Sequence, residues 1–161
     1  TGEVMGIDYD FGRAYYKAST AADNTLPTEG NVFISVTDEQ KEELLPIARK
    51  LRELGLTLYG TSGTVEFLAQ NGIEANLVRK VQEGSPNVID AMRSGSIRLI
   101  INTPADKASR QDHIQIMRAA VDYGIPYITT LQAARAAAMA IEAIKHEEIT
   151  LEPLAHYHGL V

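Results

Sequence analysis

Apolar residues along this chain follow two different spacings in turn. Short, nearly continuous apolar runs occur at 32–36, 56–59, 75–78, 98–102 and 126–129. Such runs are typical of strands buried on both faces. Helical spacing of apolar residues occurs at 44–54, 64–71, 88–92, 113–123 and 131–144. The alternation predicts an α/β fold with three layers, Rossmann-like or flavodoxin-like, in which a five-stranded, mostly parallel sheet carries helices on both faces.

Turn and capping residues agree with these boundaries. Glycines follow the expected helices at positions 55, 72, 95 and 124, where helices commonly end. Thr37 and Asp38 are candidate caps for the helix after the first strand. Pro46 lies within that helical pattern and predicts a kink, because proline removes one helix hydrogen bond.

The first thirty residues differ from the rest. Asp10 could cap a helix that carries Phe11 and Ala14, and a polar connector with Pro and Gly follows over 20–30. We therefore divide the chain into a lead-in helix and linker at 1–30 and a compact domain at 31–161. The end of that domain, 150–161, has no firm periodicity.

Composition excludes several functions. The 161 residues include no cysteine, which rules out disulfides and thiolate chemistry and is compatible with a reducing cytosol. A net charge of −6 argues against nucleic acid as a partner. No apolar run is long enough for a membrane helix, and the first residues do not resemble a signal peptide. A chain that starts without methionine is expected to be a fragment or a processed product.

Polar side chains collect where the predicted strands end. In a parallel sheet, ligands bind outside these carboxyl ends, which share one edge. The polar residues that follow the strands are Ser35, Thr37, Asp38, Lys41, Thr61, Ser62, Thr64, Arg79, Lys80, Asn102, Thr103, Lys107, Arg110, Thr129 and Thr130. Hydroxyls, an amide and several cations at one edge are what a phosphorylated, hydroxyl-rich ligand such as a nucleotide needs.

The segment Thr61-Ser62-Gly63-Thr64 is the most specific of these signals. It joins a strand to a helix, and glycine and hydroxyl residues at a helix start suit a phosphate or carboxylate. Taken alone, the same residues are ordinary turn and capping chemistry. Only their position beside the other polar residues favours an anion site.

No complete catalytic or metal-binding arrangement is recognisable. His156 and His158 could ligate zinc as a pair, but no third ligand is apparent nearby, so we expect no metal. The sequence has neither a Walker-type loop nor a Gly-x-Gly-x-x-Gly run, and no serine–histidine–acid trio can be assembled. A receiver domain would need clustered acids after the first strand, where Asp38 lacks an acidic companion.

From about Asn31 to Lys145, the chain resembles the methylglyoxal-synthase-like (MGS-like) domain. The matching blocks are 32–36, 59–64, 78–84, 99–104 and 127–131, in the same order and spacing. Within this family the chain is most similar to the C-terminal regulatory domain of carbamoyl-phosphate synthase large chains, because Thr1–Gly6 and the following helix look like the segment that leaves an ATP-grasp domain. The loop Glu83–Asn87 lacks the Gly-Asp context that methylglyoxal synthase requires.

The resemblance implies regulation without catalysis. It implies one overlapping site for UMP and IMP, with phosphate held at Lys41, Thr61, Gly63, Thr64 and Lys80. Taken over motif by motif, the effector-binding residues are Ser35, Lys41, Thr61, Ser62, Gly63, Thr64, Lys80, Asn102 and Thr103. Pro104 departs from the family pattern, which has a hydroxyl residue there, so that ligand contact is expected to be either missing or supplied by Thr103.

Further partners also come from the resemblance alone. Tyr127 and Thr129 match the family's contribution to an ornithine site. The parent enzyme would be a cytoplasmic ATP-dependent ligase that uses ATP, Mg²⁺ or Mn²⁺ and K⁺, with the ATP-grasp domains of the same chain and a glutaminase small subunit as partners. The domain itself would need no cofactor, and it could form a homo-oligomer.

Two other readings remain. The same phosphate cradle would serve a stand-alone lyase acting on dihydroxyacetone phosphate. A purely structural or oligomerising domain would fold without binding any nucleotide.

Overall fold

A computed structural model describes residues 3–103 and 110–159. Its strands are β1 (Asn31–Ser35), β2 (Thr57–Gly60), β3 (Asn76–Leu77), β4 (Ile97–Asn102) and β5 (Tyr127–Ile128). Its α-helices are α1 (Phe11–Ala21), α2 (Lys41–Glu53), α3 (Ser62–Gln70), α4 (Val88–Arg93), α5 (Arg110–Asp122), α6 (Leu131–His146) and α7 (Leu154–Tyr157). Short 3₁₀ turns occupy Asp38–Gln40 and Val81–Glu83.

The five strands form one sheet in the order β3-β2-β1-β4-β5, and every pairing is parallel. Chain connections run outward from β1 in one direction through β2 and β3, and in the other through β4 and β5. The order therefore reverses between β1 and β4, which is where ligands bind in open α/β sheets. The predicted fold class is confirmed.

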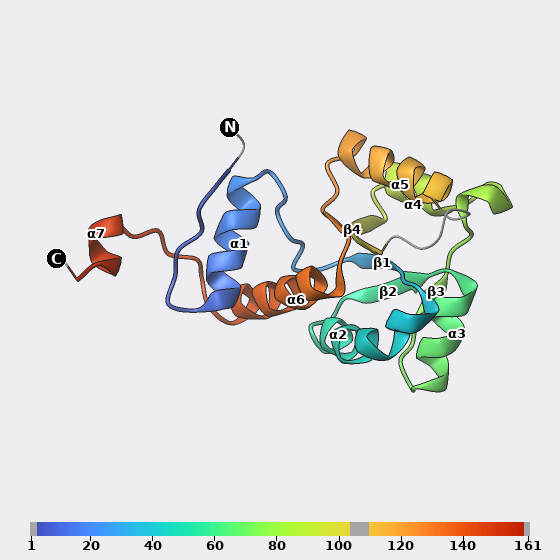
Figure 1. The fold of residues 1–161 in the computed structure, drawn as a ribbon, viewed down its shortest axis with the longest axis horizontal. Helices are drawn as coiled ribbons and strands as arrows, with labels where there is room; N and C mark the ends of the chain where they lie inside the picture. The colour runs from blue at the N-terminus through green and yellow to red at the C-terminus, as the bar shows by residue number, and fades with distance from the viewer. Residues whose placement is uncertain (1–2, 104–109, 160–161) are drawn as a thin grey trace.

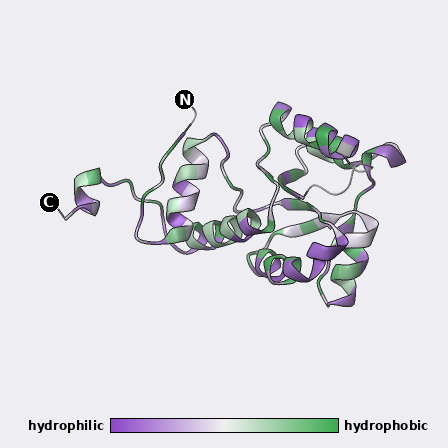
Figure 2. Cartoon of the chain, in the orientation of Figure 1, coloured by the Kyte–Doolittle hydropathy of each residue, from purple (hydrophilic) through white to green (hydrophobic). Residues whose placement is uncertain are grey.

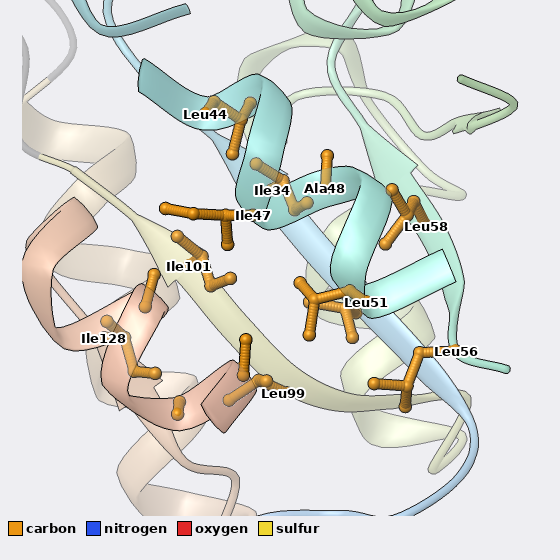
Figure 3. Close-up of a cluster of buried hydrophobic side chains, with 14 of the residues drawn as sticks. Ile34, Leu44, Ile47, Ala48, Leu51, Leu56, Leu58, Leu99, Ile101 and Ile128 are labelled. Atoms are coloured by element: carbon orange, nitrogen blue, oxygen red, sulfur yellow. The ribbon is translucent and has the colours of Figure 1, made fainter. Parts of the chain in front are cut away.

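Two apolar clusters hold helices against the two faces of the sheet. On one face, Leu44, Ile47 and Leu51 of α2 pack onto strand residues such as Ile34 and Ile101 (Figure 3). On the other face, α4 and α5 cover residues that include Phe33 and Ile100. The chain thus encloses its own core from both sides, with α2 and α6 below the sheet and α4 and α5 above it in Figure 1.

The hydropathy of the helices matches these positions. Hydrophobic and hydrophilic residues alternate along α2 and α5, whereas α6 is pale to green over most of its length (Figure 2). Most of its alanines, including Ala134, Ala137 and Ala140, are buried in the core. In the described part of the chain, no helix is long and apolar enough to cross a membrane.

Several local predictions needed correction. The chain does not enter α2 directly after β1 but first makes the 3₁₀ turn Asp38–Gln40, and neither Thr37 nor Asp38 caps α2 itself. Pro46 lies inside α2, as its place in the helical pattern indicates, and the kink there stays a prediction. The final segment, for which no element was predicted, forms α7.

The lead-in helix α1 crosses α6 at close range (Figure 1). Gly12 is buried at the crossing, and a Cβ added there would lie 2.5 Å from the carbonyl oxygen of Met139. Only glycine permits this approach of the two backbones, so Gly12 fixes where α1 sits on α6.

A group of charged side chains fastens the segment before α1. The Asp8 carboxylate accepts from Lys17 Nζ at 2.7 Å and from Arg13 Nε at 3.1 Å, and its side chain is only 9 % exposed. Arg13 also bonds Glu147, beyond α6. Burial by itself raises the pKa of Asp8, but hydrogen bonds from Lys17, the Asp10 backbone and Arg13 outweigh it and lower the pKa to about 2.

Replacing Gly12 by alanine should lower the free energy of unfolding by about 1–3 kcal/mol, because the new methyl group overlaps the Met139 backbone. Urea unfolding measures the change. Thr20→Ala, at an exposed position of the same helix, is the control and should be nearly neutral. A Gly12→Ala protein as stable as the wild type would contradict the described crossing.

Asp8 should also make stability depend on pH. Because its folded-state pKa is lowered from 3.8 to about 2, its contribution is complete above pH ~4 and is lost as the pH falls through the folded-state value. Asp8→Asn should therefore be less stable than wild type at pH 5, and the two proteins should converge near pH 2. Urea unfolding at several pH values tests this. A stability difference that stays constant over that range would argue against the buried cluster.

Candidate functional site

A cavity of about 440 Å³ opens at the carboxyl edge of the sheet, over the ends of β1, β2 and β4. This volume is within the range of small-ligand pockets. Its lining residues are Phe33, Ser35, Val36, Asp38, Lys41, Thr61, Gly63, Thr64, Lys80, Val81, Gln82, Val88, Asn102, Thr103, Asp112, His113 and Ile116. The cavity lies at the reversal of strand order, as the topology predicts.

Buried polar residues single out this cavity. In the described part of the chain, the buried polar residues are Thr61, Thr64, Asn102 and Thr103, and all four line it. Burying polar groups costs free energy unless they are hydrogen-bonded, so proteins seldom place several of them together without a use. The arrangement indicates a binding site.

One end of the cavity is the turn from β2 into α3. Thr61 stands at the N-cap in an extended conformation, and its side chain makes no capping bond. The first amide groups of α3 have no partner within the helix and point out of its start. Gly60 lets the turn approach β1, because a Cβ there would lie 3.0 Å from the carbonyl oxygen of Ile34. An anion is favoured at such a helix start.

Lys41 brings a positive charge to the same end. Its Nζ lies beside Gly63, where an added Cβ would be 3.5 Å away, and 5.8 Å from the centroid of the Phe67 ring. The Lys41 side chain is 17 % exposed and pairs at 2.7 Å with Asp38, whose side chain is 88 % exposed. The hydrogen bond from Lys41 lowers the pKa of the Asp38 carboxyl.

The other end is built from β4, β5 and α5. Asn102 Nδ2 donates to the Tyr127 hydroxyl at 3.0 Å, and that hydroxyl lies 3.1 Å from His113 Nδ1. Burial raises the pKa of Tyr127 to about 12, so the hydroxyl keeps its proton at neutral pH. Thr103 donates to Gln40, which ties the end of β4 to the 3₁₀ turn after β1.

Asp112 lines the cavity, and one of its carboxylate oxygens makes no hydrogen bond within the described residues. In the described part of the chain, Asp112 Oδ1 is the buried side-chain polar atom without a hydrogen-bond partner. An ionised carboxylate oxygen can only accept hydrogen bonds. A ligand that presents hydroxyl groups beside Asp112 would supply the missing donor.

Most of the predicted effector residues meet in this cavity. Those that line it are Ser35, Lys41, Thr61, Gly63, Thr64, Lys80, Asn102 and Thr103. Ser62 does not line it; it is exposed on the first turn of α3. Tyr127 lies behind Asn102, and Thr129 is exposed beyond the end of β5. Pro104, Lys107 and the Arg110 side chain lie outside what the structure describes.

Sequence reasoning missed four polar residues around the cavity: Gln40, Gln82, Asp112 and His113. The helical pattern at 113–123 located α5 approximately but began after Asp112 and gave no sign of which residues face the ligand edge. Gln40 belongs to the unpredicted 3₁₀ turn. Within residues 3–103 and 110–159, no three potential metal-ligating side chains gather.

A parallel sheet with a polar, partly cationic cavity at its switch point defines an α/β ligand-binding domain. More specifically, the chain belongs to the MGS-like domain family, whose sequence model matches residues 43–129. That match begins within α2 and ends just after β5, so it includes the cavity's lining residues from Thr61 onward but neither those of β1 nor Lys41.

Curated relatives agree with this assignment. The chain is 92 % identical over its whole length to a carbamoyl phosphate synthase large chain of Methanoculleus marisnigri. It is 80 % identical over 98 % of its length to one from Methanosphaerula palustris and 74 % identical over 98 % to one from Methanoregula boonei. In each case the chain spans 15 % of the relative's length. The chain therefore corresponds to one portion of such proteins.

Asp38→Asn should raise the affinity for inorganic phosphate, because Asp38 holds the Lys41 ammonium that would otherwise bind the anion. We expect roughly a two- to fivefold gain, the range for an exposed ion pair. Calorimetric titration measures it. Glu39→Gln changes the net charge equally in the same turn without touching Lys41 and should have less effect. Equal gains in both variants would mean that only net charge matters.

Proposed function

We propose that this chain is an effector-binding region of a carbamoyl phosphate synthase large chain, and that its cavity binds a nucleoside monophosphate such as UMP or IMP. The observation that carries the proposal is that the four buried polar residues of the described ranges gather, with Lys41 and Lys80, around one cavity. The names of its relatives are the reason for proposing carbamoyl phosphate synthase as the enzyme to which the chain belongs.

The two ends of the cavity suit the two ends of a nucleotide. Lys41, Lys80 and the start of α3 would hold the phosphate through charge-assisted hydrogen bonds. The sheet order puts β1 between this end and Asn102, so the ligand would cross the end of the central strand. Apolar side chains from Phe33, Val81, Val88 and Ile116 would contact the sugar and base.

Asp112 would accept from the ribose. Asp112 lines the cavity and its buried Oδ1 has no hydrogen-bond partner among the described residues, so a ribose hydroxyl would be the donor that a nucleotide provides. A simple phosphate ester without hydroxyl groups would leave this oxygen without a partner.

Binding would act as a signal and not as chemistry. An effector changes an enzyme only through its different affinities for two states, and the coupling free energy is typically about 1–3 kcal/mol. In this proposal the ligand orders the turn at Thr61–Thr64 and the loop at Lys80. The change would reach the ATP-using domains, with their Mg²⁺ or Mn²⁺ and K⁺, through β5 and the lead-in.

Ornithine binding is a separate part of the proposal. Thr129 is exposed just beyond β5 and is available to a ligand or a neighbouring domain. The Tyr127 hydroxyl instead points to Asn102, so its side chain would serve ornithine only by leaving that bond. The acidic ligands would come from elsewhere in the parent chain.

The lyase reading is not favoured. The relatives reported above are named as carbamoyl phosphate synthase large chains, and none of the names reported above is that of a methylglyoxal synthase. Turnover of dihydroxyacetone phosphate to methylglyoxal by this chain would reverse the preference.

Calorimetry with UMP, IMP and inorganic phosphate tests the proposal. The chain should bind the nucleotides and make no carbamoyl phosphate by itself. Lys80→Glu should abolish the phosphate-dependent binding and leave the fold intact, because Lys80 is exposed at the cavity rim. Arg79→Glu, the matched charge reversal one residue earlier and outside the cavity lining, should bind nearly as wild type does.

Failure of wild-type protein to bind either nucleotide at millimolar concentration would refute the proposal. Unchanged UMP affinity in Lys80→Glu would remove only Lys80 from the site.

A further inference from the structure

The hydrogen-bonded chain Asn102–Tyr127–His113 lies outside the proposed phosphate site, and the resemblance assigns Tyr127 to a different ligand. Asn102 and His113 line the cavity, whereas the Tyr127 hydroxyl stands behind them and contacts both. The three residues come from β4, β5 and α5. In the pairing of β4 with β5, Tyr127 lies beside Ile100, which is two residues before Asn102 on the same strand. The tyrosine side chain therefore extends along the sheet to reach Asn102.

The direction of these hydrogen bonds fixes the orientation of an amide. An amide nitrogen only donates, so the Tyr127 oxygen accepts from Asn102 Nδ2. The hydroxyl still has its own hydrogen, and His113 Nδ1 at 3.1 Å accepts it when the imidazole carries its proton on Nε2. The His113 and Tyr127 rings also pack edge to face, with centroids 5.7 Å apart.

An amide held in this way offers one particular pair of groups to the cavity. Asn102 Nδ2 carries two hydrogens. When the hydrogen directed away from the carbonyl oxygen donates to Tyr127, the second hydrogen and the carbonyl oxygen remain free to face a ligand. The carbonyl oxygen and the second hydrogen then form an acceptor and a donor side by side. Bidentate pairing of this kind is how asparagine reads a base edge.

We propose that Tyr127, held by His113, orients the Asn102 amide so that the cavity selects nucleotides whose base presents a ring N–H next to a carbonyl. Uracil and hypoxanthine carry this edge. Cytosine and adenine carry the opposite pair, a ring nitrogen acceptor beside an amino donor, and would need the amide turned over. The inference rests on the proposed nucleotide function and makes Tyr127 a positioning residue without ligand contact.

The experiment measures UMP and CMP affinities, with inorganic phosphate as a third ligand, for wild type, Tyr127→Phe and Tyr123→Phe. Tyr123 is the matched control, because its hydroxyl also bonds a side chain, Arg93, but lies outside the cavity lining. Wild type and Tyr123→Phe should prefer UMP roughly tenfold or more, the range for a bidentate base contact. Tyr127→Phe should lose most of this preference while its phosphate affinity stays unchanged.

A second variant keeps the test independent of Tyr127 itself. His113→Phe preserves the edge-to-face packing and removes the acceptor, so it should also reduce the UMP-to-CMP ratio. Wild-type preference for CMP, or an unchanged ratio in Tyr127→Phe and His113→Phe, would overturn the inference while leaving nucleotide binding established. Absence of nucleotide binding in folded wild-type protein would overturn the proposed function and this inference with it.

Discussion

The central strand β1 is buried on both faces and hydrogen-bonded to β2 on one side and β4 on the other, and the site depends on this arrangement. Because β1 leads into α2 on one face while β4 leads into α5 on the other, the connections diverge and leave the carboxyl ends of the two strands uncovered. Lys41 and Thr61 therefore reach the cavity from one side and Asn102 from the other. The same apolar packing that holds the sheet together also sets the distance between the two ends of the proposed ligand.

The carboxyl edge of the sheet carries positive charges although the chain as a whole is negatively charged. A net charge of −6 disfavours anion binding in general, yet Lys41 and Lys80 line the cavity together with the start of α3. Asp38 is the nearest competitor, since its carboxylate already holds Lys41. At Lys41, an effector phosphate would replace the ion pair with Asp38 by an ion pair with the ligand, whereas at Lys80 it would add a new charge contact.

Much of this organisation could be predicted from the sequence because its signals are local. The run Val32–Val36 identified a doubly buried strand, and glycine and hydroxyl residues at 61–64 located a helix start. The convergence of site residues followed from one rule about parallel strands. Ser62 shows the limit of that reasoning: it shares the motif, but the helical turn carries its side chain away from the cavity.

Other features depend on contacts between distant residues, which no local pattern encodes. The hydroxyl of Tyr127 meets Asn102 only because of the register between β4 and β5. The buried position of Asp8 requires Lys17 and Arg13 on the following helix. The fit of α1 onto α6 depends on Gly12, which in the sequence is one glycine of twelve.

The proposed function requires that the start of α3 and the neighbouring lysines together bind an anion. Titration of inorganic phosphate into the ¹⁵N-labelled chain, followed by amide chemical shifts, tests it most directly. The largest shifts, saturating with phosphate concentration, should belong to the amides of Ser62, Gly63 and Lys80. Shifts that are absent there, or that concentrate around Arg13 and Lys17 instead, would contradict it.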